Sequence, residues 1–267
     1  MSAQPDFKRT TGDSLDFLSH DCGRIARNVD WAATALGPPQ TWSPALRMMM
    51  KFTLANRFPQ MLWWGPEYVC SYNDAYAPVL GAKHPWAMGK PVKEVWGEIW
   101  EVLRPLIDTP FMGGPSTWIE DFELDLHRHG FVEECHFTVA YSPVPDETAP
   151  RGIGGVLATI VEITDKVISE RRVEILRELG SRVAESKSDV DACTVAINIL
   201  AQHLHDVPFA MLYLLDRDGR RLRLVSRTGI EAETAGAAEI DLEGEASAAR
   251  WPLAAALRAE QIGRAHV

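Results

Sequence analysis

The sequence lacks the features that mark several whole classes of protein. Its four cysteines are widely scattered and form no C-x-x-C pair, so neither a disulfide framework nor a zinc framework is expected. No apolar run approaches the roughly 18 residues of a membrane span, and the N-terminus lacks the apolar core of a secretory signal. A formal net charge of -10 argues against nucleic acid or an anionic membrane surface as the main partner. We therefore expect a cytoplasmic protein with reduced thiols, no membrane span and no nucleic-acid partner.

Residue combinations that carry catalysis are also scarce. Cys135 and His136 are neighbours, but on a strand they would point to opposite faces and could not act as nucleophile and base. His127 and His129 could share a metal ion in a turn, yet no third ligand is evident nearby, which favours a simple exposed turn. The glycines between 152 and 155 precede a strand and lack the following helix or lysine of a phosphate loop. The sequence thus predicts no catalytic residue and no metal ligand.

What the sequence does contain is an ordinary globular balance, with 46 % hydrophobic and 24 % charged residues. Apolar and alternating runs predict five strands in the first part of the chain, at 60–64, 68–72, 121–127, 131–144 and 154–164. Helices are expected from Ser43 onward, over 75–80 and over 95–107, and Asn73 or Asp74 is expected to cap the second of these. Two strands, then helices, then three strands in a meander imply one antiparallel five-stranded sheet with helices on one face.

The pattern changes after residue 165. Residues 166–187 are helical and strongly charged, with a narrow apolar stripe formed by Val173, Leu176, Leu179 and Val183. A narrow stripe on a charged helix favours a two-chain coiled coil over a globular core helix, although Arg172 and Gly180 weaken the pattern.

A second unit begins at Ser188, which together with Asp191 resembles a capping box. A helix and two strands, 208–216 and 220–229, follow, and residues 230–260 show no clear strand. Because a helix and two strands cannot complete an α+β domain, we expect residues 188–261 to be a fragment. The last residues, 262–267, read IGRAHV, which is the translation of a common sequencing-adapter DNA. We expect that the reading frame ran into adapter there; the alternative is a natural tail.

Several of these segments resemble known signalling domains. Residues 45–165 resemble a PAS domain, and the matching residues are Trp63-Trp64-Gly65-Pro66, Asn73-Asp74-Ala75-Tyr76, Leu80-Gly81, Tyr141-Ser142-Pro143 and Glu162-Ile163-Thr164-Asp165-Lys166. The lead-in, 1–44, is similar to the N-terminus of a bacterial subgroup of PAS-containing sensor histidine kinases, on the residues Asp30-Trp31, Leu36-Gly37-Pro38 and Trp42. Residues 188–261 look like the start of a GAF domain, with Asp206-Val207-Pro208-Phe209 leading into its first strand.

The resemblance implies the sensory half of a signalling protein with an α+β fold. A PAS-like domain would bind a small ligand or a partner domain, and the linker helix, paired with its copy in a homodimer, would relay the change to an incomplete GAF-like domain. The complete protein would be a histidine kinase of a two-component phosphorelay, with a response regulator as partner and ATP bound only in a kinase core downstream. The alternatives are a parent with a PPM-type phosphatase or cyclic-dinucleotide output, and a stand-alone ligand-binding or interaction module.

The alternation along one strand suggests a pocket on one face of the sheet. Glu133 is in phase with Phe131, Cys135, Phe137, Val139 and Tyr141, and if that face looks inward, the buried acid needs a partner. It could then bind donor groups of a ligand together with Trp96 and Trp100; the alternative is that Glu133 faces solvent near the turn or is rotated outward by a bulge. The pocket candidates are Trp96, Trp100, Glu133 and Tyr141.

The sequence identifies no cofactor, so the cofactor is unknown. The helix after Tyr76 has no cysteine, so the loop of the flavin-binding light-sensing PAS subgroup is missing. His84 could ligate a haem, but a lone histidine before Pro85 is weak evidence for such a site.

Overall fold

The computed structural model describes residues 21–231 and 238–242 of the chain. The chain divides into two compact units, Met1–Asp165 and Lys166–Val267. The adapter interpretation of 262–267 lies outside the described residues, as do residues 1–20 of the lead-in. None of the described helices is long and apolar enough to cross a membrane.

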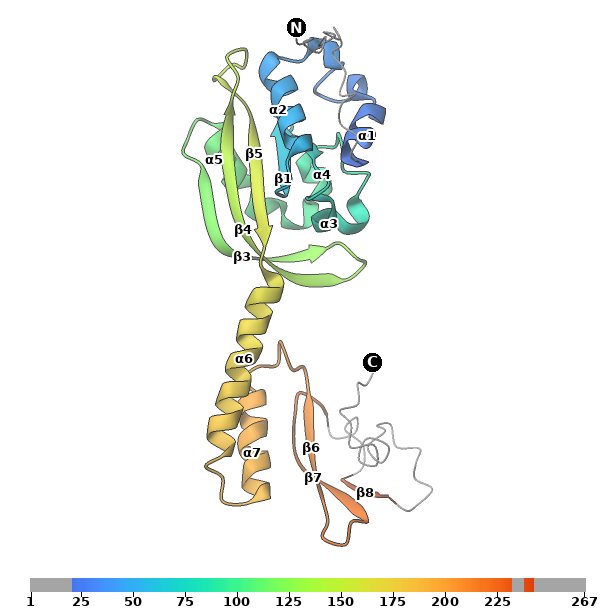
Figure 1. Cartoon of the computed structure of the whole chain (residues 1–267), viewed down its shortest axis with the longest axis vertical. Helices are drawn as coiled ribbons and strands as arrows, with labels where there is room; N and C mark the ends of the chain where they lie inside the picture. The colour runs from blue at the N-terminus through green and yellow to red at the C-terminus, as the bar shows by residue number, and fades with distance from the viewer. Residues whose placement is uncertain (1–20, 232–237, 243–267) are drawn as a thin grey trace, which may run out of the picture. The chain divides into compact units, whose positions relative to one another are not determined.

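The first unit is built on a five-stranded antiparallel sheet with the strand order β2-β1-β5-β4-β3 (Figure 1). The strands are β1 (Gln60–Trp64), β2 (Val69–Tyr72), β3 (Thr117–His127), β4 (Val132–Pro145) and β5 (Ile153–Glu162). The predicted antiparallel sheet is confirmed. Strand β3 begins at Thr117 and not at Asp121, because a register shift between Ile119 and Phe122 interrupts the alternation on which the sequence prediction depends.

One layer of short helices covers the inner face of the sheet. These are α3 (Ala77–Leu80), η3 (Gly81–Lys83), α4 (Val92–Val95), η4 (Gly97–Ile99) and α5 (Trp100–Phe111). The continuous helix expected over 95–107 is therefore wrong. It breaks at Trp96, which leaves helical geometry at φ -119 and ψ 40, just before Gly97. Glycine is among the poorest helix formers, and here it separates α4 from α5.

Helix α2 (Pro44–Ala55) covers the opposite, outer face of the sheet. Ser71 Oγ donates to Met50 Sδ of this helix at 2.8 Å. Ser71 is paired with Leu62, and the side chain of Leu62 points away from that of its neighbour Trp63, which faces the inner layer. The prediction that helices cover only one face of the sheet is therefore wrong. All five residues of β1 are buried, so this strand needs cover on both faces.

Helix caps join the N-terminal segment to the sheet. Asn73 Oδ1 accepts from the Tyr76 amide at 3.0 Å in the turn before α3, but α3 itself begins at Ala77 without a side-chain cap, so the predicted cap of this helix by Asn73 or Asp74 is not found. Asp74 has a different role, because its Oδ1 accepts from the amide of Cys22 at 2.7 Å. Cys22 lies in the first turn of α1 (Asp21–Asn28), so Asp74 caps a helix that is distant in sequence.

The second unit contains α6 (Thr164–Val183), which begins at the end of the first unit, α7 (Asp189–Leu200), and an antiparallel sheet with the order β6-β7-β8. Its strands are β6 (Ala210–Leu215), β7 (Arg221–Thr228) and β8 (Glu239–Asp241). Ser188 Oγ accepts from the Asp191 amide at 3.2 Å, which confirms the predicted cap of α7. Strand β8 falls where no strand is predicted, since three residues are too few to show a period.

Candidate functional site

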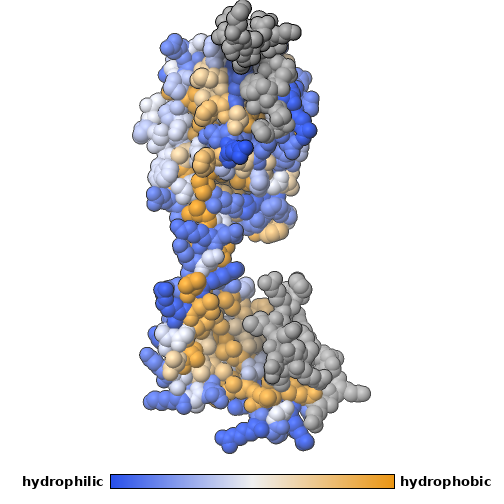
Figure 2. Space-filling model, in the orientation of Figure 1, coloured by the Kyte–Doolittle hydropathy of each residue, from blue (hydrophilic) through white to orange (hydrophobic). Residues whose placement is uncertain are grey.

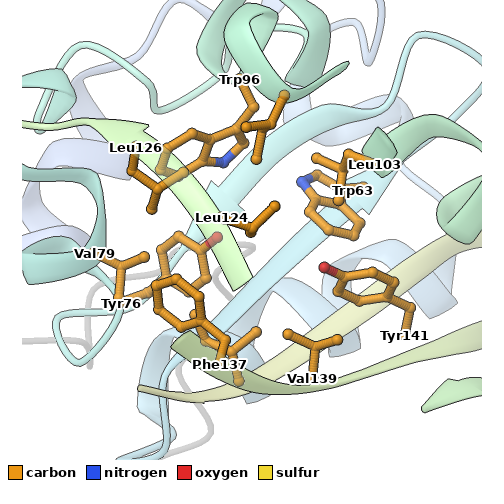
Figure 3. A pocket seen from close by; sticks show the side chains of 12 residues that line it. Trp63, Tyr76, Val79, Trp96, Leu103, Leu124, Leu126, Phe137, Val139 and Tyr141 are labelled. Carbon is orange, nitrogen blue, oxygen red and sulfur yellow. The ribbon is translucent and has the colours of Figure 1, made fainter. Parts of the chain in front are cut away.

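A cavity lies between the inner face of the sheet and the helical layer (Figure 3). The sheet contributes Trp63, Leu124, Leu126, Phe137, Val139, Tyr141 and Ile160. The helical side contributes Tyr76, Val79, Trp96, Ile99 and Leu103. Every lining side chain is apolar or aromatic. About 30 Å³ of the cavity is open to the centres of water molecules, which is room for roughly two waters.

The polar atoms of the cavity belong to its aromatic side chains. Trp63 is 1 % exposed, and its indole Nε1 is buried with no hydrogen-bond partner among the described residues. Tyr141 lies against it, with ring centroids 5.2 Å apart and the planes at 65°. Burial raises the pKa of the Tyr141 hydroxyl, so this group stays protonated and can donate. In Figure 3 the Trp63 nitrogen and the Tyr141 hydroxyl both lie on the side of their rings that faces the open space.

Two of the four predicted pocket residues, Trp96 and Tyr141, line this cavity. Trp100 does not, and this corrects the sequence analysis. On a continuous helix Trp96 and Trp100 would share one face at a spacing of four residues. The break at Gly97 removes that relation, and the Trp100 ring packs instead near the Tyr68 ring, with centroids 6.4 Å apart.

Glu133 is likewise outside the cavity. It is paired with Leu126 near the β3–β4 turn, where Arg128 Nε donates to its Oε2 at 3.0 Å and His129 Nδ1 lies 2.6 Å from its Oε1. Burial acts to raise the pKa of Glu133, but the hydrogen bonds from His129 and Arg128 outweigh it and hold this pKa below its ordinary value. The partners of this acid are residues of the turn and not a ligand, so the position of Glu133 agrees with the alternative that placed it near the turn.

The sequence analysis missed most of the cavity wall. Leu124 and Leu126 belong to the alternating run DFELDLH, and this half-buried pattern could have identified them. Trp63 had no such signal. Because β1 is apolar on both faces, periodicity could not tell whether Trp63 or Trp64 points to the inner layer.

A second group of contacts lies where β5 leaves the sheet. The Ile163 amide donates to the His136 carbonyl at 2.8 Å, and the His136 amide donates to Thr164 Oγ1 at 2.9 Å. Thr164 is the first residue of α6. The backbone of β4 at His136 therefore holds the joint between the sheet and α6. We call this set of contacts the exit joint.

The His136 side chain is locked between two carboxylates. It is 4 % exposed; its Nδ1 lies 2.6 Å from Asp121 Oδ1, and its Nε2 lies 2.8 Å from Glu134 Oε1. Burial alone would lower the pKa of His136, but the hydrogen bonds to Glu134 and Asp121 outweigh it and raise this pKa above the ordinary value. When the ring is protonated, both nitrogens donate.

Replacing His136 with Gln should flatten the pH dependence of stability. The folded pKa of His136 lies above its unfolded value of about 6.5. Its stabilising contribution is therefore complete below that pH and is lost as the pH rises through the folded pKa. Denaturant unfolding of wild type from about pH 6 to 9 should show this decline, and His136→Gln should not. His127→Gln, an exposed control, should keep the wild-type slope. Equal slopes in wild type and His136→Gln would contradict the assignment.

No protein-family model and no curated protein matches the sequence, but solved structures do resemble it. A sensory box sensor histidine kinase from Vibrio cholerae is 19 % identical, with a TM-score of 0.32 over 45 % of this chain and 90 % of that one. The PAS domain of Bordetella pertussis BvgS is 18 % identical, with a TM-score of 0.31 over 50 % and 97 %. A LOV protein from Rhodobacter sphaeroides is 12 % identical, with a TM-score of 0.36 over 61 % and 94 %. PAS domains are thus among the structural neighbours of this chain, at low identity and over part of its length.

Proposed function

We propose that this chain is the sensory region of a bacterial sensor histidine kinase, in which the first unit detects a small molecule in its cavity and passes the signal to α6. One observation carries the proposal: a single strand, β4, both lines the cavity and holds the exit joint. Phe137 lines the cavity, and His136, the residue before it, bonds to Ile163 and Thr164. A ligand that moves Phe137 therefore acts on the first turn of α6.

The exit joint suits a relay because hydrogen bonds hold it from β4 and from the β3–β4 turn. Thr164 Oγ1 also lies 3.1 Å from Glu162 Oε1, and Glu162 in turn accepts two hydrogen bonds from Arg128, at 2.9 and 2.7 Å. Paired fork contacts of this kind fix geometry as well as supply energy. The end of β5 is thus held from β4 and from the β3–β4 turn, and a shift of either strand changes how α6 begins.

The output assignment depends on the N-terminal segment of the chain. The residues that resemble the kinase subgroup, Asp30-Trp31, Leu36-Gly37-Pro38 and Trp42, are packed together: the Trp31 and Trp42 rings are 5.2 Å apart, and Trp42 Nε1 donates to the Gly37 carbonyl. In this proposal the kinase core, its ATP and its response regulator belong to a part of the protein downstream of the chain. The linker helix and a GAF-like domain connect that part to the cavity.

We also propose that α6 pairs with α6 of a second copy. Val173 and Leu176 are 54 % and 66 % exposed on this helix, whereas Ile175 is buried within its own unit. Gly180, which is exposed, and Val183, which is half-buried, continue this line at a spacing of four and three residues, which is the spacing of a coiled-coil seam. Figure 2 shows apolar residues on the surface of this unit among charged ones. A symmetric helix pair offers two packing arrangements, which a relay needs.

Overpacking the cavity should loosen the exit joint. Val139→Phe adds volume to the cavity wall on β4, and overpacking typically costs ~1–3 kcal/mol. We expect native-state hydrogen exchange of the Ile163 amide to become about tenfold faster, because its bond to the His136 carbonyl depends on β4. Thr138→Val, on the opposite face of the same strand, is the matched control and should leave that rate unchanged.

The amide of Cys70, bonded to the Lys90 carbonyl, serves as a reference away from β4. Equal acceleration at Cys70 and Ile163 would mean general destabilisation, and no acceleration at Ile163 would mean that the cavity and the exit joint are not coupled. Either result would contradict the proposed relay.

Leu176→Lys should dissociate a dimer of the full chain. A charge in the seam loses apolar burial and places two like charges opposite each other across the symmetry axis. Sedimentation should shift from dimer to monomer. Ser181→Lys adds the same charge to the same helix on another, exposed face and should leave the dimer intact. A wild-type chain that sediments as a monomer at high concentration would refute the pairing.

Genomic sequencing through the codon for Glu260 and beyond tests the kinase assignment. We expect a completed GAF domain, then a helix with a phosphoacceptor His-Glu pair, then an ATP-binding lobe with Asn and Gly boxes. A stop codon directly after Val267 in confirmed genomic DNA would exclude both the adapter interpretation and the kinase assignment. The chain would then be a stand-alone binding module.

A further inference from the structure

Deepening the proposed function, on which this step rests, we propose that the cavity takes a small, uncharged ring compound with a hydrogen-bond acceptor such as a carbonyl oxygen. The acceptor would be received by the indole N–H of Trp63 and the hydroxyl of Tyr141. The site is assigned from its unpartnered donor, its aromatic wall and the lack of charge in its lining.

The unpartnered donor is the strongest sign of a ligand. Trp63 Nε1 is buried and points into the cavity, yet it has no partner among the described residues (Figure 3). The great majority of buried polar groups are hydrogen-bonded, and leaving one unpaired costs about 1–3 kcal/mol. Cys70, which is paired with Trp63 across β1 and β2, does not fill the gap. Burial raises the pKa of the Cys70 thiol and outweighs the hydrogen bond by which Trp63 would stabilise the thiolate. The sulfur therefore stays protonated and is a poor acceptor.

A second donor belongs to the ring that packs against Trp63. The Tyr141 ring packs edge-on against Trp63, and the hydroxyl stays protonated because burial raises its pKa. One carbonyl oxygen has two lone pairs and can accept from both groups. A water molecule could do the same in the free protein, since the cavity has room for roughly two. A ligand oxygen would replace such a water and keep its hydrogen bonds.

The lining excludes a charged ligand. None of the residues around the cavity is ionic. Glu133, the one acid that the sequence analysis proposed for the pocket, bonds instead to Arg128, which also donates to Glu162 at the end of β5. An ion brought into an apolar site without a partner loses its hydration, at a cost far above that of a neutral ring. The carboxylate analogue of a binding compound should therefore not bind.

The wall and the size of the cavity indicate a single ring. Tyr76, Trp96 and Phe137 present aromatic surface, which favours a flat partner in edge-to-face or offset contact. In this form the free space is smaller than a ring, so binding must push lining side chains apart. That requirement gives a ligand different affinities for two arrangements of β4, which is the condition for a signal.

The test uses the full chain and three one-ring probes: acetophenone, toluene and benzoate. Affinities are measured by titration, following the indole N–H signals in ¹H–¹⁵N spectra, with Trp63 assigned through Trp63→Phe. Acetophenone should bind about 2–10-fold tighter than toluene and shift the Trp63 signal. Benzoate should bind more weakly than either.

Two variants remove one donor each and keep a ring. Tyr141→Phe and Trp63→Phe should each lower the affinity for acetophenone by about 2–10-fold and leave the affinity for toluene unchanged. Tyr68→Phe is the matched control, because Tyr68 is a buried tyrosine outside the cavity whose hydroxyl bonds to Asp108 at 2.5 Å. It should change neither affinity. Tyr141→Phe decides the matter if Trp63→Phe does not fold.

Equal affinities for acetophenone and toluene, with no effect of Tyr141→Phe, would overturn the inference and leave a merely apolar ligand site. Tighter binding of benzoate would also overturn it. If neither neutral ring binds, the inference fails, while the proposed function is judged separately by the exchange of the Ile163 amide, which needs no ligand.

Discussion

The first unit depends on one buried side chain, that of Asn73, which is fully inaccessible to solvent. Its Nδ2 donates to the carbonyls of Asn56 and Phe58 at 3.0 and 2.7 Å, and its Oδ1 accepts from the amides of Gln60 and Tyr76 at 3.1 and 3.0 Å. These groups belong to the end of α2, the start of β1 and the entry to α3. The outer layer, the sheet and the inner layer thus meet at one amide. Aspartate has nearly the same shape but lacks the two donors, so it would leave two carbonyls unpaired.

Once β1 is fixed at its start, its two tryptophans point into opposite layers. Trp63 enters the cavity, and Trp64 turns to the outer side, where β5 must pass close beneath it. A Cβ at Gly155 would lie 2.4 Å from the Trp63 carbonyl, and one at Gly154 would lie 2.3 Å from Trp64 Cζ2. Only glycine allows this approach. The aromatic run around the Gly65-Pro66 turn therefore places one large ring in each layer.

Much of this fold could be read from the sequence because the signals were local. The strand periods and the caps at Ser43 and Ser188 each depend on residues within a few positions of one another. The features that were missed depend on contacts between distant residues. Asp74 caps α1 across 52 positions, and the cover of α2 on β1 shows only once Ser71 is known to face Met50. The cavity was predicted in part for the same reason: the break before Gly97 separates Trp100 from Trp96 by a local change that periodicity alone does not report.

Strand alternation explains how one strand can serve both the cavity and α6. Phe137 points inward and His136 outward, so the two roles lie one residue apart on opposite faces of β4. The outward ring is fixed to Asp121, which sits in the β3 bulge at a φ of 51 that aspartate tolerates better than most residues. In the proposed relay, the outer side is held and a displacement of Phe137 is passed along the backbone to Ile163 and Thr164. Coupling of this kind is reciprocal: if a ligand favours one arrangement of α6, then whatever fixes that arrangement must raise the affinity of the cavity by the same factor. A single coupling free energy then links ligand affinity to the packing of α6, and the contacts of β4 determine its size.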